Sequence, residues 1–515
     1  MKQLSLSLAD LLGEDYLKAV CAARSALTGE DPQALWGIAE TKVPFLPERF
    51  MDAQERLMRR IGSAVASGLT PGIPGAATKS FTKAQNSAAS PLSSLGCFRV
   101  GEDGRLYFAA KSEHYQIPLG HGFPGFQLID YAKRLGIPNA THNSARGYIT
   151  RFCEQQLVLA AAGRGPDSAP DDLIASESPQ VLNRVLNLET GSLAVEATLK
   201  MMMAQFYPIS GAAARYPGRI PVFLVMADYA GGITAGYHGT TFIAQTLRGL
   251  WPDFRGKAEE HGLYRVVSVP INDAEGFARI IGQYNRAPFK TAGFCHEIIM
   301  MNYGAEVLEK EYLQQAYALC HRYDTPVLCD EIQSCGWYDG VFLFKQYRLS
   351  PDFLVMGKGL PGGNYPASKV ICTAPYDNLI QFGALVTNGQ EELASLSYLI
   401  SMAFLRENGA TITAWGQHFH QSLKALALAH PALCEGTNGH AHMSALRFLD
   451  VQSANRFCER MQRDYAVDVS AQAYKPNCPP TALFKLPLIT TPAMMDILCQ
   501  AMDACLSGME QEESA

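Results

Sequence analysis

Short apolar runs alternate with longer helix-like stretches between about residues 180 and 375, and this pattern restricts the possible folds more than any other feature. The runs are rich in Val, Ile and Phe, and strands are expected at 221–227, 264–270, 293–300, 326–332, 352–357 and 368–373. Helices are expected between them, at 193–206, 273–286 and 309–323. Near-continuous apolar strands separated by helices are typical of a mainly parallel sheet that is covered on both faces. The sequence therefore predicts an α/β fold.

The regions on either side of this pattern differ from it. Apolar residues recur at three- and four-residue steps from residue 1 to about 60, which indicates helices. Residues 62–96 are dense in Gly, Ala, Ser and Pro and are expected to form a mobile linker or loop. From about 390 the chain is helix-rich with a few short strands, and 487–506 is typical of a closing amphipathic helix. Because 515 residues are too many for one compact core, we expect an N-terminal helical extension with its linker (1–100), a large domain (101–385) and a smaller C-terminal α+β domain (386–515).

Charge and apolar content exclude several classes of function. The formal net charge of −6 argues against a nucleic-acid-binding face, which is usually basic. No apolar run reaches the roughly 18 residues of a membrane span, and Asp10, Glu14 and Asp15 interrupt any signal-peptide core near the N-terminus. The 13 cysteines form no CxxC pair, which favours reduced thiols. We therefore expect a soluble cytoplasmic protein with no nucleic-acid or membrane partner.

Two histidine pairs are the candidates for metal ligands. They are His418/His420 and His440/His442, and neither pair has a third ligand at a suitable spacing. We therefore expect exposed surface histidines and no metal site.

Asp330 and Lys358 are the residues best placed for chemistry. Asp330 closes one expected strand and Lys358 follows the next, 28 residues later, which is enough for one strand-to-strand crossover. Both would then lie at neighbouring strand ends, where α/β sheets bind their ligands. A buried carboxylate needs a cationic partner, and a desolvated lysine amine is a nucleophile that forms Schiff bases. The alternatives are a helix N-cap for Asp330 and a surface-loop lysine for Lys358.

The stretch from Asp330 to Pro366 resembles the core of class III (ornithine/ω-amino acid type) aminotransferases, which are fold-type I pyridoxal-phosphate enzymes. The matching parts are Asp330-Glu331-Ile332-Gln333, the aromatic-rich FLFKQY, Pro351-Asp352 before a strand, and KGLPGG from Lys358. Further segments resemble the family in order along the chain, at 104–124, 189–200, 236–241 and 386–394. The resemblance runs in fragments from about 104 to 506 and implies a divergent member. It also implies the fold-type I arrangement of a large, mainly parallel domain and a smaller C-terminal α+β domain.

The resemblance implies a role for each matching residue around the cofactor, pyridoxal 5′-phosphate. Lys358 would form the resting Schiff base and then act as a general base and acid on the substrate. Asp330 would keep the ring nitrogen protonated, and Gln333 would hydrogen-bond the ring 3′-oxygen. Ile332 and Tyr237 would pack on opposite faces of the ring.

Other matching residues concern the phosphate and the partner subunit. The backbone N–H groups of Gly191 and Ser192, at a helix N-terminus, would hold the cofactor phosphate. His238 would neighbour the ring, although a packed core histidine fits the motif equally well. Thr387 would donate to the phosphate of the partner subunit's cofactor, so a homodimer with shared active sites is expected.

Several positions depart from the family pattern, and they concern the substrate more than the cofactor. They are Leu193 for a glutamate, Asn302 for the second acidic residue after Glu297, Gln390-Glu391-Glu392 for Gly-Asn-Pro, Ala109 for an aspartate, and Lys485 for an arginine. Lysine lacks the two-pronged guanidinium, so tight binding of a substrate carboxylate at Lys485 is not expected. These departures predict an unusual substrate.

The expected reaction is transfer of an amino group from an amino acid or amine to a 2-oxo acid through Lys358. A racemase or epimerase on the same fold is the first alternative, because reprotonation from the other face needs only a second acid. A non-catalytic descendant that acts as a binding partner is the second alternative. The intact Lys358, Asp330 and Gln333 argue against it.

Overall fold

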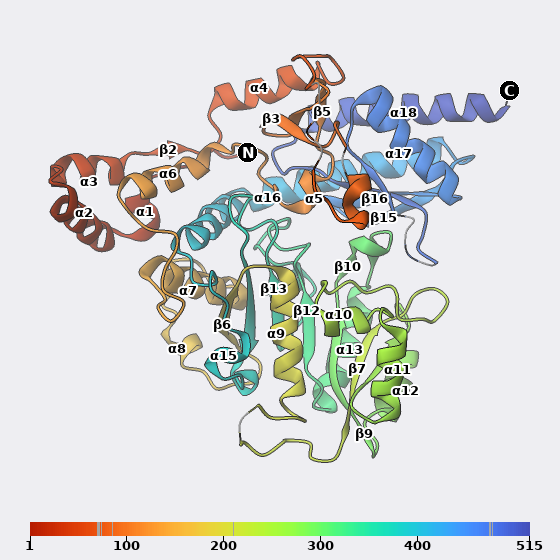
Figure 1. Cartoon of the computed structure of the whole chain (residues 1–515). Helices are drawn as coiled ribbons and strands as arrows, with labels where there is room; N and C mark the ends of the chain where they lie inside the picture. The colour runs from red at the N-terminus through yellow and green to blue at the C-terminus, as the bar shows by residue number, and fades with distance from the viewer. Residues whose placement is uncertain are drawn as a thin grey trace.

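A mainly parallel sheet forms the centre of the larger part of the molecule, as the alternating apolar runs predict (Figure 1). The computed structural model describes residues 1–514 except 70–72, 74, 85, 210, 473, 474 and 476. The main sheet has the strand order β6 (Leu182–Leu188), β14 (Ser368–Thr373), β13 (Phe353–Met356), β12 (Val327–Asp330), β9 (Phe289–His296), β7 (Ile220–Met226) and β8 (Arg265–Val269). Its strands run parallel, apart from β14, which is antiparallel to both of its neighbours.

The strand β7 shows why its apolar run is continuous rather than alternating. Val222, Leu224 and Met226 belong to one hydrophobic core, and Phe223 and Val225 belong to another. Successive side chains of a strand point to opposite faces of the sheet, so β7 is buried on both faces. Each fully buried side chain of this kind contributes roughly 1.5–3 kcal/mol.

Helices cover both faces of the main sheet. α9 (Gly191–Met203) packs across β6, β13 and β14 and supplies one core, and Figure 1 shows it in front of these strands. α12 (Ala274–Gln283) and α13 (Lys310–Arg322) supply the other core. The three helices expected between the strands are therefore confirmed, with ends that differ by one to three residues.

Two parts of the strand pattern differ from expectation. The run 293–300 is not one strand, because β9 ends at His296 and β10 (Ile299–Met300) pairs instead with β11 (Glu306–Val307). β6 is absent from the expected strands, since Asn and Arg interrupt its apolar character. Its antiparallel pairing with β14, which lies far along the chain, stabilises it. Local sequence does not contain that information.

A second, C-terminal unit lies above the main sheet in Figure 1. Its antiparallel sheet has the order β15 (Cys434–His440), β16 (Met443–Phe448), β18 (Thr481–Lys485) and β17 (Ser470–Gln472). Its helices are α16 (Glu392–Ala429), α17 (Val451–Tyr465) and α18 (Pro492–Ser514). The expected closing helix at 487–506 is present as α18, which starts later and extends further. None of the described helices combines the length and apolarity that crossing a bilayer requires.

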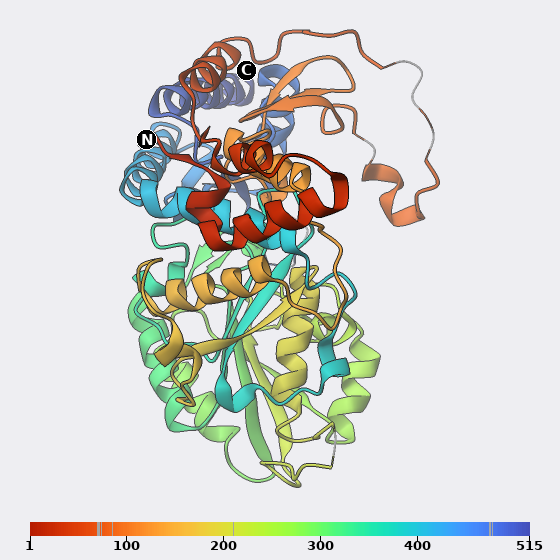
Figure 2. The same ribbon diagram turned by 90° about the vertical axis from the view of Figure 1, so that its left-hand side faces the viewer.

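The N-terminal helices are confirmed and lie beside the C-terminal unit (Figure 2). They are α1 (Leu8–Leu12), α2 (Glu14–Thr28), α3 (Pro32–Glu40) and α4 (Glu48–Met58), of which α4 contacts α18. Ser7 and Asp10 form a capping box that starts α1. Tyr16 of α2 stacks on Tyr148 at the start of α7 (Tyr148–Ala162), with ring centres 4.1 Å apart.

The stretch 62–96 is only partly a loop. Residues 70–72, 74 and 85 lie outside the described residues, so the expectation is not assessed there. The expectation is wrong for Pro91–Leu95, which forms β3 and pairs with β4 (Phe98–Gly101). β4 in turn pairs with β5 (Leu106–Phe108), and the backbone N–H of Phe108 donates to Ala466 of the C-terminal unit at 2.9 Å.

Candidate active site

A cavity of about 440 Å³ lies where β12 and β13 end, and it brings most of the predicted site residues together. Its lining includes Gly191, Ser192, Tyr237, His238, Asp330, Ile332 and Lys358. These residues come from separate segments of the chain and meet at the carboxyl ends of the parallel strands, where α/β sheets bind ligands. Gln333 and Thr387 are not among the residues that line the cavity.

Asp330 is the last residue of β12 and is almost completely buried. One carboxylate oxygen accepts from the backbone N–H of Ile332 at 3.1 Å. The other pairs with Nδ1 of His238 at 2.9 Å. A turn rather than a helix follows Asp330, so the N-cap alternative is wrong. His238 is both buried and part of the site.

Lys358 follows β13 and has a left-handed backbone, with φ of +39°. A residue with a side chain adopts this conformation rarely, and such strain collects at functional sites. The amine lies 5.3 Å from the ring centre of Tyr115. Burial lowers the pKa of Lys358 below that of an ordinary lysine, although the negative charges of Glu297 and Asp330 act in the opposite direction. A lysine that loses its proton easily is a better nucleophile.

The N-terminus of α9 forms a small cradle on the cavity wall. The hydroxyl of Thr190 accepts from the backbone N–H of Ser192 at 3.1 Å, and the hydroxyl of Ser192 accepts from the N–H of Thr240 at the same distance. A Cβ on Gly191 would lie 2.6 Å from Ile332 Cδ1. A Cβ on Gly239, whose φ is +103°, would lie 2.8 Å from Ser192 Cα. Both glycines are therefore required for this close approach.

Tyr237 is half-buried, and the guanidinium of Arg248 lies 4.8 Å from the centre of its ring. The sequence does not reveal this contact. Ile332 packs against Gly191 at the N-terminus of α9. A Cβ on Gly357 would lie 2.6 Å from Cδ1 of Ile332, so there is no room for one. These contacts fix the two side chains that the motifs assign to the faces of the cofactor ring.

Gln333 and Glu297 form a buried pair beside the cavity. The side-chain amide of Gln333 donates to Glu297 at 2.7 Å. The second oxygen of Glu297 and the amide oxygen of Gln333 are buried and have no hydrogen-bond partner among the described residues. Burial, with the nearby charge of Asp330, raises the pKa of Glu297 to about 7. Orphaned polar atoms of this kind in a site indicate a missing ligand group or ion.

Replacing Glu297 with Gln is expected to remove a pH dependence from folding. The carboxyl has an ordinary pKa of 4.5 and a folded pKa of about 7. Between these values the folded protein keeps a proton that the unfolded chain has lost, so the free energy of unfolding falls as the pH rises. From pH 5 to 7 the free energy of unfolding of the wild type should fall by about 1 to 3 kcal/mol more than that of Glu297→Gln. Urea unfolding of the cofactor-free protein at several pH values measures this difference.

The exposed Glu275 at the start of α12 supplies the control, Glu275→Gln. Its unfolding profile should follow that of the wild type. Parallel profiles for Glu297→Gln and the wild type would show that Glu297 titrates normally.

The departures from the family pattern have different structural explanations. Glu392 accepts from the N–H of Ile149 at 2.8 Å and from the hydroxyl of Thr150 at 2.8 Å, so it caps α7. Glu391 accepts from the side-chain amide of Asn139 at 2.8 Å. These acids therefore stabilise the packing of α16 on its neighbours. Thr387 lies in an exposed turn just before them.

The expectation of exposed histidines is wrong at two of the four positions, His420 and His442. His442 is fully buried, and its Nε2 hydrogen-bonds the backbone oxygen of Ile412 at 2.8 Å, because it packs under α16. His418 and His440 are exposed, as expected, and His420 is half-buried. Within the described ranges, no cluster of three or more possible metal ligands occurs.

Several lining residues are missing from the motif-based set. They include Gln116, Glu189, Thr190, Val195, Asn364 and Tyr365. Thr190 could have been found as the N-cap residue of α9, and Asn364 and Tyr365 as the continuation of the glycine-rich turn after Lys358. Gln116 carries no signal, because only the fold brings its segment to the cavity.

Comparisons with known proteins agree with this geometry. The family model described as Aminotransferase class-III matches residues 83–463. An ornithine aminotransferase from Halalkalibacterium halodurans is 28% identical over 290 residues, which are 52% of this chain and 58% of the relative. An adenosylmethionine-8-amino-7-oxononanoate aminotransferase from Buchnera aphidicola is 27% identical over 228 residues, which are 41% of this chain and 48% of the relative. The chain thus spans about half the length of these curated relatives.

Solved structures share the fold. An ornithine aminotransferase from Toxoplasma gondii, crystallised with oxidized glutathione and with partial occupancy of PLP at its active site, superposes with a TM-score of 0.63 at 18% identity. That match covers 83% of this chain and 92% of the other. A transaminase from the marine bacterium Virgibacillus gives a TM-score of 0.66 at 14% identity, covering 86% and 98%. The predicted fold-type I arrangement is confirmed.

Proposed function

Because this chain belongs to the class-III aminotransferase family, we propose that it transfers an amino group from an amino acid or amine to a 2-oxo acid, with pyridoxal 5′-phosphate as its cofactor. The observation that carries the proposal is that Lys358 and Asp330 line one cavity together with the N-terminus of α9. These residues supply an amine, a carboxylate and an anion site. The two curated relatives described above are aminotransferases, which favours transfer over racemisation.

The residues present fit this cofactor. The orphaned oxygens of Gln333 and Glu297 lie beside the cavity, and Gly191 and Ser192 at the N-terminus of α9 line it, where backbone N–H groups would hold a phosphate. Gln333 would hold the ring 3′-oxygen, once its amide is turned so that the nitrogen faces the ring. The oxygen and nitrogen of such an amide are assigned from their partners. Ile332 and Tyr237 would contact the two ring faces.

The cofactor supplies the electron sink when it is bound, and the chain supplies proton transfer and charge. Lys358 would hold the cofactor covalently, and its freed amine would take the proton from the substrate carbon and return it. Asp330 would favour a protonated ring nitrogen, which an opposite charge stabilises by about 1–3 pKa units. His238 holds the carboxylate of Asp330 in place through the contact at 2.9 Å.

The assembly and location are also part of the proposal. The exposed position of Thr387, outside the cavity of its own chain, suits a donor to the phosphate in a partner subunit. We therefore propose a homodimer with shared active sites. A small-molecule amino donor and an oxo acceptor are its partners, and the charge and cysteine pattern favour the cytoplasm.

Pyridoxal phosphate added to the purified protein should produce a visible absorption band. Amines and amino acids offered without an oxo acid should then bleach this band and release a carbonyl product, because the amino group stays on the cofactor. Absorbance and product analysis measure both effects. A protein that produces no band contradicts the proposal, and inversion of one amino acid enantiomer without bleaching would show a racemase instead.

A further inference from the structure

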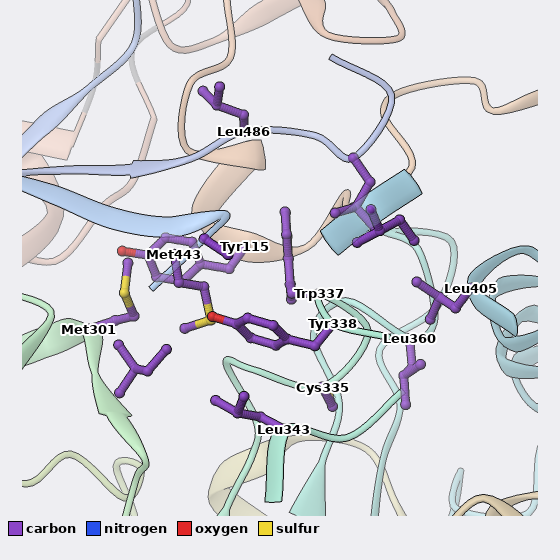
Figure 3. Close-up of a cluster of buried hydrophobic side chains, with 14 of the residues drawn as sticks. Tyr115, Met301, Cys335, Trp337, Tyr338, Leu343, Leu360, Leu405, Met443 and Leu486 are labelled. Atoms are coloured by element: carbon purple, nitrogen blue, oxygen red, sulfur yellow. The ribbon is translucent and has the colours of Figure 1, made fainter. Parts of the chain in front are cut away.

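Lys485, at the end of β18, has its amine between two aromatic rings. The amine lies 4.4 Å from the ring centres of both Tyr115 and Trp337, and the residue is fully buried. The amine donates to the backbone oxygen of Gln333. Figure 3 shows the apolar cluster that contains the two rings, with Met443, Leu343 and Leu486 nearby. Lys485 therefore points into a hydrophobic cluster and not into the cavity, whose lining does not include it.

The backbone of Lys485, like its side chain, forms hydrogen bonds to other segments of the chain. Its N–H donates to the oxygen of Ala110 at 2.8 Å. Its own oxygen accepts from the hydroxyl of Ser112 at 2.6 Å. One residue thus joins the segment around Ala110 and Ser112, the strand β18, and the turn after β12 that carries Gln333.

The segment held by Lys485 is strained. Four consecutive residues, Ser112 to Tyr115, have left-handed φ values of 47°, 48°, 61° and 74°. Outside glycine this conformation costs roughly 1–2 kcal/mol for each residue, so neighbouring contacts must maintain it. Arg99, which donates to Glu113 at 2.7 Å, maintains it from one side, and Lys485 from the other.

The strained turn places Tyr115 between two amines. The ring centre is 5.3 Å from the amine of Lys358 and 4.4 Å from that of Lys485. Burial, with the charge of Lys358, lowers the pKa of Lys485 well below that of an ordinary lysine. An enclosed amine that already donates to a backbone oxygen and lies outside the cavity lining is a poor receptor for a carboxylate, which needs a positive charge that it can reach.

We propose that Lys485 is a positioning residue, which anchors the backbone at Gln333 and holds Tyr115 beside Lys358, and that it does not receive the carboxylate of the substrate. The proposal rests on the proposed transfer reaction, because Gln333 and Lys358 act there on the cofactor. It follows that the rates of transfer from simple primary amines and from α-amino acids depend on Lys485 to the same extent. Any preference between these two donor classes arises elsewhere in the site.

The variant Lys485→Met keeps the length and apolar character of the side chain but removes the donor. Its kcat should fall about five- to tenfold, the value of one hydrogen bond, for an amine without a carboxylate and for an α-amino acid alike. The pH at which the visible band of the bound cofactor changes should also shift, because the surroundings of Lys358 change. Lys485→Gln supplies an N–H donor again and should recover part of both effects.

Lys290 offers a matched control, because it is another buried lysine beside a ring. Its amine lies 4.9 Å from the ring centre of Tyr216 and donates to the backbone oxygens of Tyr323 and Asp324 at 2.7 and 2.8 Å. It lies near the start of β9, away from the cavity. Lys290→Met should therefore lower the melting temperature without shifting the absorbance profile or the kcat.

The opposite result has a distinct signature. If Lys485 receives the carboxylate, Lys485→Met raises the KM for the amino acid but not the KM for the amine donor. The absorbance profile is then unchanged, and Lys485→Gln does not restore the KM for the amino acid. That outcome overturns the inference while the proposed function stands. If the Met variant does not fold, the Gln variant decides by the same comparison of donors. A wild-type protein without a visible band or turnover overturns the proposed function, and the inference with it.

Discussion

Lys358→Ala is expected to lower kcat by about 10²- to 10⁴-fold or more, the range that a positioned general acid and base contributes. The alanine variant cannot bind the cofactor covalently and has no amine to move the substrate proton. Pyridoxal phosphate should still bind, because the cradle at α9 and the carboxylate of Asp330 remain. Single-turnover kinetics and cofactor titration measure the two effects separately.

A second lysine change supplies the control for this prediction. Lys257 is exposed on α11 (Pro252–Glu260), and Lys257→Ala should retain wild-type kinetics. Near-normal turnover by Lys358→Ala would assign the base to another residue. Loss of cofactor uptake together with unfolding would show that Lys358 is needed for the fold instead.

Asp330→Asn should lower kcat/KM about 10- to 1000-fold while the protein stays folded. Asparagine has the shape of aspartate but no charge, so it no longer favours the protonated ring nitrogen by 1–3 pKa units. It also weakens the pairing with His238, now at 2.9 Å. Steady-state kinetics, with the melting temperature as a check on folding, test this expectation.

The matching surface change is Asp253→Asn in the first turn of α11, where the side chain is exposed. It removes the same charge from a residue outside the cavity lining and should leave the kinetics unchanged. If Asp330→Asn behaves in the same way, another group protonates the ring, and the proposed role of Asp330 is wrong.

The sequence predicts those features that depend on local pattern. The strand β7 is recognisable because both of its faces are buried. Asp330 and Lys358 line one cavity because they lie at the ends of adjacent parallel strands. A periodic run is enough to place a strand, and a strand end is enough to place a site residue. The catalytic roles assigned to these residues stay predictions.

The features that the sequence does not predict depend on contacts between distant segments. β6 is a strand because it pairs with β14, and His238 meets Asp330 across 92 residues. The place of Lys485 between Tyr115 and Trp337 is another example, because the three residues belong to different parts of the chain. The periodicity of apolar residues in the sequence does not indicate such contacts.

The sequence alone also does not show whether a departure from the family pattern changes the site or the packing around it. The acidic residues Glu391 and Glu392 stand where the family has a small turn, which suggests a change in the site. In the structure Glu392 caps α7 instead, and Glu391 binds Asn139. The substitution therefore concerns helix packing, whereas the lysine at position 485 is enclosed by Tyr115 and Trp337.

Phe108 donates to Ala466 and accepts from Asp468, each at 2.9 Å, so this residue joins an early and a late segment of the chain through both its backbone N–H and its carbonyl oxygen. A truncation that removes one of these segments would expose unpaired backbone groups on the other, and such exposed edges promote aggregation. The two segments must therefore be kept or removed together when this protein is trimmed, fused or divided.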